Sequence, residues 1–314
     1  MLPIHLIPQQ PNINFLRYKW IAVGLTLFLT LASIFVVSTK GLSYGIDFSG
    51  GIMMEVAATD GSKVDLAGMR EHLNSLSLGE VALQEFGKEN HVLIRVQQQK
   101  GGQAEQMAAV QKVRESLGAK YDFRRVEFVG PKVGDELVRD STIAVLLSMA
   151  GIMLYIWFRF EWQYGVNALI AAIYDVVTTL GIYSLFNIEF NLTSIAALLT
   201  LAGYSINDKV VVYDRIRENL RKYKKMPMEE LLNLSVNQTL ARSVMTSVTV
   251  FLAVLALLFF GGEVIRGFNI AMTWGVLVAM FSSVYVAAPL ILWMMPERKE
   301  TDPETNGDRY QNAA

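Results

Sequence analysis

The sequence predicts a membrane protein: an all-α bundle of six transmembrane helices with a folded α+β domain inserted after the first helix. Two observations predict this fold. The 314-residue chain is 52% hydrophobic and only 18% charged, whereas soluble domains carry about a quarter charged residues. The apolar residues are also gathered into long blocks, and only the segment between the first and second block shows the short periodicities of a water-soluble domain.

The six blocks are long enough to cross a bilayer core, which takes about 17–25 mostly apolar residues. We place them at about Trp20–Ser38, Ser141–Phe158, Tyr164–Phe186, Leu192–Val212, Ala241–Phe260 and Phe268–Met295. The first lacks a small-residue cleavage pattern before Lys40, so we interpret it as an uncleaved anchor and not a signal peptide. The last is long enough to tilt, or to bend at Pro289.

Basic residues predict the orientation of these helices, because cytoplasmic loops carry an excess of Lys and Arg. The two short turns at 187–191 and 261–267 offer only Arg266. The segments on the other side of the membrane hold Arg17, Lys19, Arg159, Arg215, Arg217, Arg221, Lys222, Lys224, Lys225, Arg298 and Lys299. We therefore expect both termini in the cytoplasm.

This orientation divides the chain into five parts. Residues 1–19 form a cytoplasmic N-terminus, 20–38 the first transmembrane helix and 39–139 an outer, periplasmic domain. Residues 140–295 hold the other five helices, with a basic cytoplasmic loop at 214–240, and 296–314 form a disordered cytoplasmic tail. Within the loop, Met228–Leu234 looks amphipathic, and it either lies along the membrane surface or packs its leucines on the bundle.

The outer segment changes its periodicity in a regular order. Strand-like runs are expected at Ile52–Ala57, Val81–Phe86, Val92–Gln97 and Phe123–Val129, and helices at Val64–Leu76 and Gln103–Leu117. The order β-α-β-β-α-β is that of the ferredoxin-like fold. Glycines and a proline mark the junctions with the membrane at Gly50-Gly51 and Gly130-Pro131.

Composition and motifs argue against several classes of function. A formal net charge of −1 does not favour a nucleic-acid partner, and with no cysteine there are no disulfides or thiolate metal sites. Phosphate-loop, zinc-protease and nucleophile-elbow motifs do not occur. The glycine-rich Gly45–Gly51 is followed by a strand, so it is expected to form turns and not a phosphate site. We therefore expect no enzyme, cofactor or metal.

Ionisable residues inside the spans point to function. Each costs at least about 2.5–3.5 kcal/mol on insertion, and such residues usually mark ion pathways or pair with one another. Asp208 lies in the fourth span, and Arg242 opens the fifth, with Thr246 on the same helical stripe. Asp175 lies near the middle of the third span without an evident partner, so it is the weaker candidate.

A carboxylate that faces an arginine across two helices could load and release a proton, because burial and the cation act on it in opposite directions. The alternative is a static ion pair that only fixes the register of the helices. Lys209 diverges from Asp208 by about 100° around the helix, so we expect it to leave that face and extend toward the cytoplasmic headgroups.

Several ordered motifs resemble the SecF family, the smaller subunits of the bacterial SecDF pair. They are GIDFSGG at Gly45–Gly51, VEFVGPKVG at Val126–Gly134, FRFEW at Phe158–Trp162, GYSINDKVVVYDRIREN at Gly203–Asn219 and QTLARSVMT at Gln238–Thr246. The resemblance covers nearly the whole chain. It implies half of a transporter of the resistance-nodulation-division (RND) superfamily, with SecD supplying the other six spans.

The resemblance also implies a function and partners. The family's proton-pathway residues fall on Asp208 and Arg242, with Thr246 as the hydroxyl partner, and the proton is the coupling ion. Implied partners are SecD, the SecYEG translocon, YajC and YidC, the translocating polypeptide and membrane lipid, at the bacterial inner membrane. Two positions depart from the family pattern, Lys209 in place of a small or hydroxyl residue and Tyr174 in place of a histidine.

The expected function is thus to use the proton motive force to promote late steps of protein export. Two alternatives remain open at this level. The chain could belong to a small-molecule or lipid exporter of the same superfamily, or it could be a non-conducting scaffold for the translocon.

Overall fold

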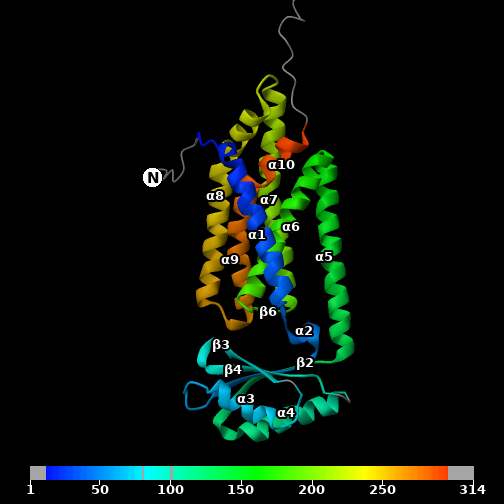
Figure 1. The fold of residues 1–314 in the computed structure, drawn as a ribbon, viewed down its shortest axis with the longest axis vertical. Coiled ribbons are helices and arrows are strands. Elements are labelled where there is room, and N and C mark those ends of the chain that lie inside the picture. Colours follow the sequence, from blue (N-terminus) through cyan, green and yellow to red (C-terminus); the bar gives the residue numbers. More distant parts are fainter. Residues whose placement is uncertain (1–11, 80, 100–101, 296–314) are drawn as a thin grey trace, which may run out of the picture.

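The computed structural model describes residues 12–79, 81–99 and 102–295 and consists of a helical bundle with an α/β domain at one end (Figure 1). Six of its helices are long and apolar enough to span a membrane. The expected disordered tail at 296–314 and residues 1–11 of the expected N-terminal segment lie outside the described residues.

The long helices of the bundle are α1 (Lys19–Lys40), α5 (Pro131–Arg159), α6 (Trp162–Leu185), α7 (Leu192–Lys222), α8 (Met228–Phe260) and α9 (Arg266–Tyr285). The short helices η1 (Leu16–Tyr18), η3 (Glu263–Ile265) and α10 (Ala287–Met294) lie beside α1 and α9 in the chain. All six predicted spans are therefore present, which confirms a multi-pass membrane protein.

Several helix ends differ from the predicted spans. Helix α5 begins at Pro131, well before Ser141, and α7 continues to Lys222, past Val212. The extra turns carry charged residues, so hydropathy does not detect them although their backbone is helical. The last span is divided between α9 and α10 at Val286, close to the bend expected at Pro289.

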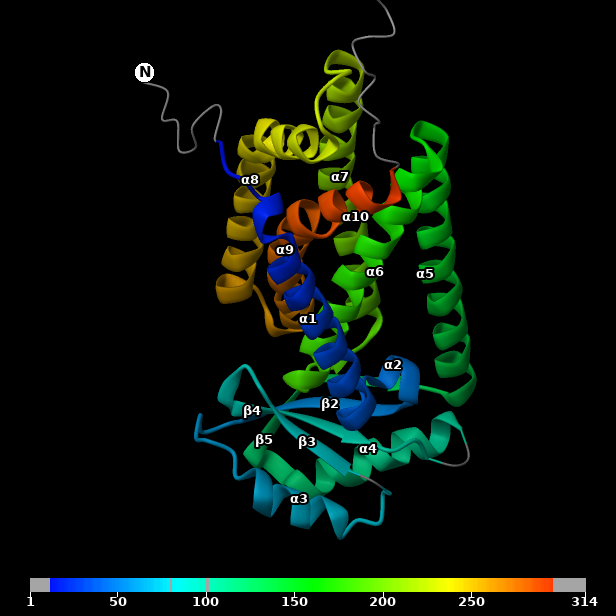
Figure 2. The ribbon, with the colours of Figure 1, turned by 45° about the horizontal axis from the view of Figure 1, so that its top comes forward.

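The start of α8 decides between the two interpretations of Met228–Leu234. This segment is continuous with the fifth span as a single helix, and its first turns cross the end of the bundle far from the α/β domain (Figure 2). Leu231 and Leu232 are fully buried in the main apolar core. The leucines thus pack on the bundle.

The α/β domain comprises β2 (Gly51–Ala58), α3 (Leu66–Asn74), β3 (Val81–Phe86), β4 (Lys88–Val96), α4 (Gln103–Leu117) and β5 (Tyr121–Val129), followed in the chain by α5. Its four strands form an antiparallel sheet in the order β3-β4-β2-β5. One face of the sheet buries Ile52, Met54 and Val56 against α3 and α4. The other face is turned toward the bundle (Figure 1).

The α/β domain is joined to the N-terminal end of α7 through a short segment. There β1 (Ser43–Tyr44) pairs in parallel with β6 (Glu189–Phe190), just before α2 (Ile46–Ser49). The Gly45 N–H donates to the carbonyl of Phe190 at 2.8 Å. A Cβ at Gly45 would lie 2.6 Å from Oε1 of Glu189 and 3.1 Å from Cβ of Asn191, so a side chain there would require the Glu189 carboxylate to move. The glycine-rich segment is thus a packing motif.

Candidate functional site

The candidate site lies on α7, which passes through the middle of the bundle and carries charged side chains on two neighbouring stripes. Tyr204 and Asp208 form one stripe, and Ser205 and Lys209 form the next, since residues four apart share a face and adjacent residues diverge by about 100°. Asp208 and Lys209 are both buried. The two stripes have different surroundings.

The stripe of Asp208 faces α8. The Tyr204 hydroxyl donates to the Ser247 hydroxyl of α8 at 2.9 Å. Because α7 and α8 are antiparallel neighbours, one turn further along α7 corresponds to one turn back along α8, which brings Asp208 to the level of Ser243. Neither Oδ2 of Asp208 nor Oγ of Ser243 has a hydrogen-bond partner among the described residues, and both atoms are buried. A buried carboxylate without a cation beside it is energetically costly in its charged form, and it is therefore available for a proton.

Arg242 and Thr246 lie on a different face of α8. Both are exposed, and the Thr246 hydroxyl donates to the carbonyls of Arg242 and Ser243, each at 3.0 Å. No ion pair between Arg242 and Asp208 occurs in the described part of the chain. The structure of this chain alone does not bring the expected pair together.

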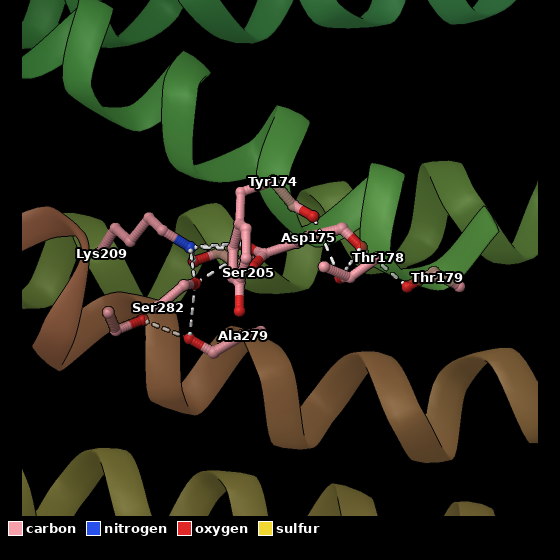
Figure 3. A network of polar contacts seen from close by, with 9 residues as sticks. Tyr174, Asp175, Thr178, Thr179, Ser205, Lys209, Ala279 and Ser282 are labelled. Carbon is pink, nitrogen blue, oxygen red and sulfur yellow. Dashed lines mark hydrogen bonds and ion pairs between the residues drawn. The ribbon is translucent and has the colours of Figure 1, made fainter. Parts of the chain in front are cut away.

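The second stripe reveals a partner that sequence reasoning missed. Asp175 of α6 and Lys209 of α7 form an ion pair at 3.0 Å (Figure 3). Neither side chain is exposed. The prediction that Lys209 extends to the headgroups is therefore wrong. Two opposite charges without partners in adjacent spans, with Ser205 one turn before the lysine, were the signal that could have suggested the pair.

The N-terminal end of α7 is held by the α/β domain. Arg95 of β4 is ion-paired with Glu189 of β6, and Oδ2 of Asp47 accepts the Leu192 N–H at the start of α7 at 3.0 Å. Burial raises the pKa of Glu189 above its usual 4.5, and the guanidinium of Arg95 opposes this shift. A cavity of about 760 Å³ lies beside these residues, between the sheet and the bundle. These contacts connect the start of α7 to the α/β domain, so a movement of α7 would shift the sheet as well.

Comparisons with known proteins agree with this architecture. Residues 109–297 match the family described as protein export membrane protein SecD/SecF, C-terminal, and residues 35–61 match the SecD/SecF GG motif. The chain is 42% identical over 303 residues to a protein translocase subunit SecF of Rickettsia felis, covering 95% of this chain and 96% of that protein. It is 43% identical over 304 residues to the SecF of Cereibacter sphaeroides, covering 94% and 93%.

Two solved structures extend the match to the fold. A crystal structure of SecDF from Thermus thermophilus, titled a translocon-associated membrane protein, matches with a TM-score of 0.84 at 37% identity, covering 92% of this chain and 39% of that chain. SecDF in its super-membrane-facing form matches with a TM-score of 0.68 at 35% identity, covering 99% and 41%. By sequence and by fold, the chain belongs to the SecD/SecF family and is a SecF-type subunit of the protein translocase.

Proposed function

We propose that this subunit couples proton movement across the bacterial inner membrane to late steps of protein export, as one half of an RND-type machine whose other half is a separate SecD-type chain. The chain spans 39% of the solved SecDF chain, so most of such a machine must be supplied from elsewhere. The proposal needs no enzymatic chemistry and no cofactor. The proton is the coupling ion, and the membrane potential supplies about 2.3 kcal/mol per charge per 100 mV.

The observation that carries the proposal is that the buried carboxylate of Asp208 has no ion-pair partner among the described residues and that its Oδ2 accepts no hydrogen bond there. Asp208 is the residue that takes up and releases the proton. Arg242 and Thr246 are exposed on α8, and Arg242 is not paired with Asp208 in the described part of the chain. In our proposal the partner half covers this face, and a shift of the helices in the assembled complex brings the arginine to the carboxylate. Asp175 is left out of this relay because its carboxylate is already bound to Lys209.

The α/β domain has the strand order of a ferredoxin-like fold. Because Lys and Arg gather in the connecting segments at the opposite end of the bundle, we place this domain in the periplasm and both termini in the cytoplasm. The Arg95–Glu189 and Asp47–Leu192 contacts transmit a movement of α7 to this domain. The α/β domain serves as a base or docking partner for the larger domain of the SecD-type chain, which grips the translocating polypeptide delivered by the SecYEG translocon. YajC, YidC and surrounding lipid complete the proposed set of partners.

The test is gradient-dependent export of a precursor protein into inverted membrane vesicles that contain the subunit with its SecD-type partner. Asp208→Asn and Arg242→Met are expected to reduce export to the level without a gradient while the complex remains assembled. Asp214→Asn is the matched control, because Asp214 lies on the same helix but is largely exposed and only loosely paired with Arg159, at 3.6 Å. Normal export by Asp208→Asn would refute the mechanism, and normal export without proton flux would identify a scaffold.

A further inference from the structure

The ion pair of Asp175 and Lys209 belongs to a closed ring of hydrogen bonds (Figure 3). The Lys209 ammonium donates to Oδ2 of Asp175 at 3.0 Å, to the Ser282 hydroxyl at 2.9 Å and to the Ser205 hydroxyl. An ammonium has three N–H donors, so all three are used. Ser205 and Ser282 donate in turn to the same oxygen of Asp175, the latter at 3.1 Å.

The ring joins three helices at a place with no exposed surface. Asp175 comes from α6, Ser205 and Lys209 from α7, and Ser282 from α9, and each of the four residues is 0% exposed. The nearby hydroxyls of Thr178 and Thr179 are engaged with backbone carbonyls of their own helix and do not extend the ring. The two charges therefore neutralise each other inside the bundle.

This ring determines which way α7 faces. Lys209 and Ser205 point toward α6 and α9, so the adjacent stripe with Tyr204 and Asp208 is directed toward α8. The hydrogen bond of Tyr204 with Ser247 shows that this second stripe does meet α8. If the ring opened, α7 could rotate about its axis, and Asp208 would turn with it.

From this geometry we propose that Asp175 and Lys209 form a permanent, self-neutralising clamp that orients α7 and so positions Asp208, and that neither residue exchanges protons during transport. The inference rests on the proposed role of Asp208. It makes Lys209 a positioning residue and gives Asp175 a role that contains no proton step.

The test compares single and double neutral variants in the same vesicles with the partner subunit. Asp175→Asn and Lys209→Met each leave one buried charge unpaired, and we expect each to reduce export or the amount of assembled complex at least about tenfold. The double variant Asp175→Asn/Lys209→Met removes both charges together. We expect it to restore assembly and gradient-dependent export to within about threefold of the natural protein, because a buried pair can often be replaced by neutral groups at little cost.

A thiol probe tests the positioning itself, since the chain contains no cysteine. Ser243→Cys lies on α8 at the level of Asp208 and should react slowly with N-ethylmaleimide, because Ser243 is only 4% exposed. Labelling should accelerate in either single variant and slow again in the double variant. Ser235→Cys, fully buried on the same helix, is the control and should stay protected in all of them.

The results separate the clamp from the proposed function. A double variant that assembles but exports no better than the single variants would overturn the clamp, because a titrating group would then be required at these positions. Single variants with normal assembly, export and labelling would overturn it as well. If Asp208→Asn exports normally, the proposed function fails, while restored assembly and labelling in the double variant would still support the clamp.

Discussion

Asp175 and Asp208 are both buried carboxylates of the same helical bundle, yet only one of them is paired with a cation. Asp175 binds an ammonium and two hydroxyls through Oδ2, although its Oδ1 has no partner among the described residues. Asp208 has no ion pair in the described part of the chain, and its buried Oδ2 accepts no hydrogen bond there. A buried charge that is paired with an opposite charge inside the bundle helps to hold the fold together. A buried charge without such a partner is available for a proton or for a group on another subunit.

The first prediction concerns stability and has the largest expected effect. Asp175→Asn or Lys209→Met should lower the free energy of unfolding of the bundle by about 3–5 kcal/mol, because one charge stays buried without its partner. Asp208→Asn should change the free energy of unfolding by less than about 1 kcal/mol, because no hydrogen bond to Oδ2 of Asp208 is lost. Thermal unfolding of the purified complex measures both, and equal losses for Asp175→Asn and Asp208→Asn would erase the contrast between the two sites.

A second prediction compares two serines of similar burial. Ser205→Ala removes a hydroxyl that is hydrogen-bonded to both charged groups of the ring, and it should cost about 1.5–3 kcal/mol of stability. Ser243→Ala removes a hydroxyl without a partner among the described residues, and it should be close to neutral. The same unfolding measurement tests the pair, and a costly Ser243→Ala would mean that this hydroxyl is engaged after all.

The third prediction uses the Arg95–Glu189 pair as a less buried relative of the Asp175–Lys209 pair, with about a fifth of each side chain exposed. Arg95→Ala should cost about 1 kcal/mol at neutral pH, because partial solvation screens the charge that remains. Burial holds the pKa of Glu189 above 4.5. The folded state therefore favours the protonated carboxyl of Glu189. The contribution of Glu189 to stability is fully present below pH 4.5 and is lost as the pH rises through the raised pKa.

Replacing this carboxyl provides the control for the pH effect. Glu189→Gln should flatten the fall in stability as the pH rises through this range, which unfolding midpoints measured across the acidic range will show. A steeper pH dependence in Glu189→Gln than in the natural protein would contradict the assigned direction of the shift.

A small effect is also expected on the open stripe of α7, by which we mean the face of α7 that carries Tyr204 and Asp208. Tyr204→Phe deletes a single hydrogen bond between neutral groups, to Ser247, and should cost about 0.5–1.5 kcal/mol. If the open stripe matters for transport and not for the fold, export should fall more than stability does. Parallel export and unfolding measurements on this variant decide the point.

Much of the fold could be predicted because it follows from local patterns. Hydropathy located all six spans, and alternating periodicity located the strands and helices of residues 51–129 in their correct order. The predicted bounds and contacts were wrong or missing where the sequence pattern carries no signal. The charged last turns of α7 up to Lys222 carry no hydropathy signal, and the junction of β1 with β6 joins short segments far apart in the chain.

The candidate site could be predicted only in part. Asp208, Asp175, Arg242 and Thr246 were identified as unusual because charged and hydroxyl groups in apolar spans are rare. The partners of these residues could not be identified, because an ion pair depends on which faces of two helices meet. Lys209 illustrates the difference: a long side chain near a helix end usually extends to the headgroups, but here an aspartate on the neighbouring helix holds it inside.

By itself, the sequence determined that the chain spans the membrane six times, carries one inserted domain and belongs with the SecF subunits. Those properties can be predicted because they depend on runs of apolar residues and on motifs that lie within single segments of the chain. Only the tertiary structure decided which buried charge is neutralised and which is not. The physical reason is that electrostatic compensation acts over a few ångströms between side chains, and such short distances arise only after the helices have packed.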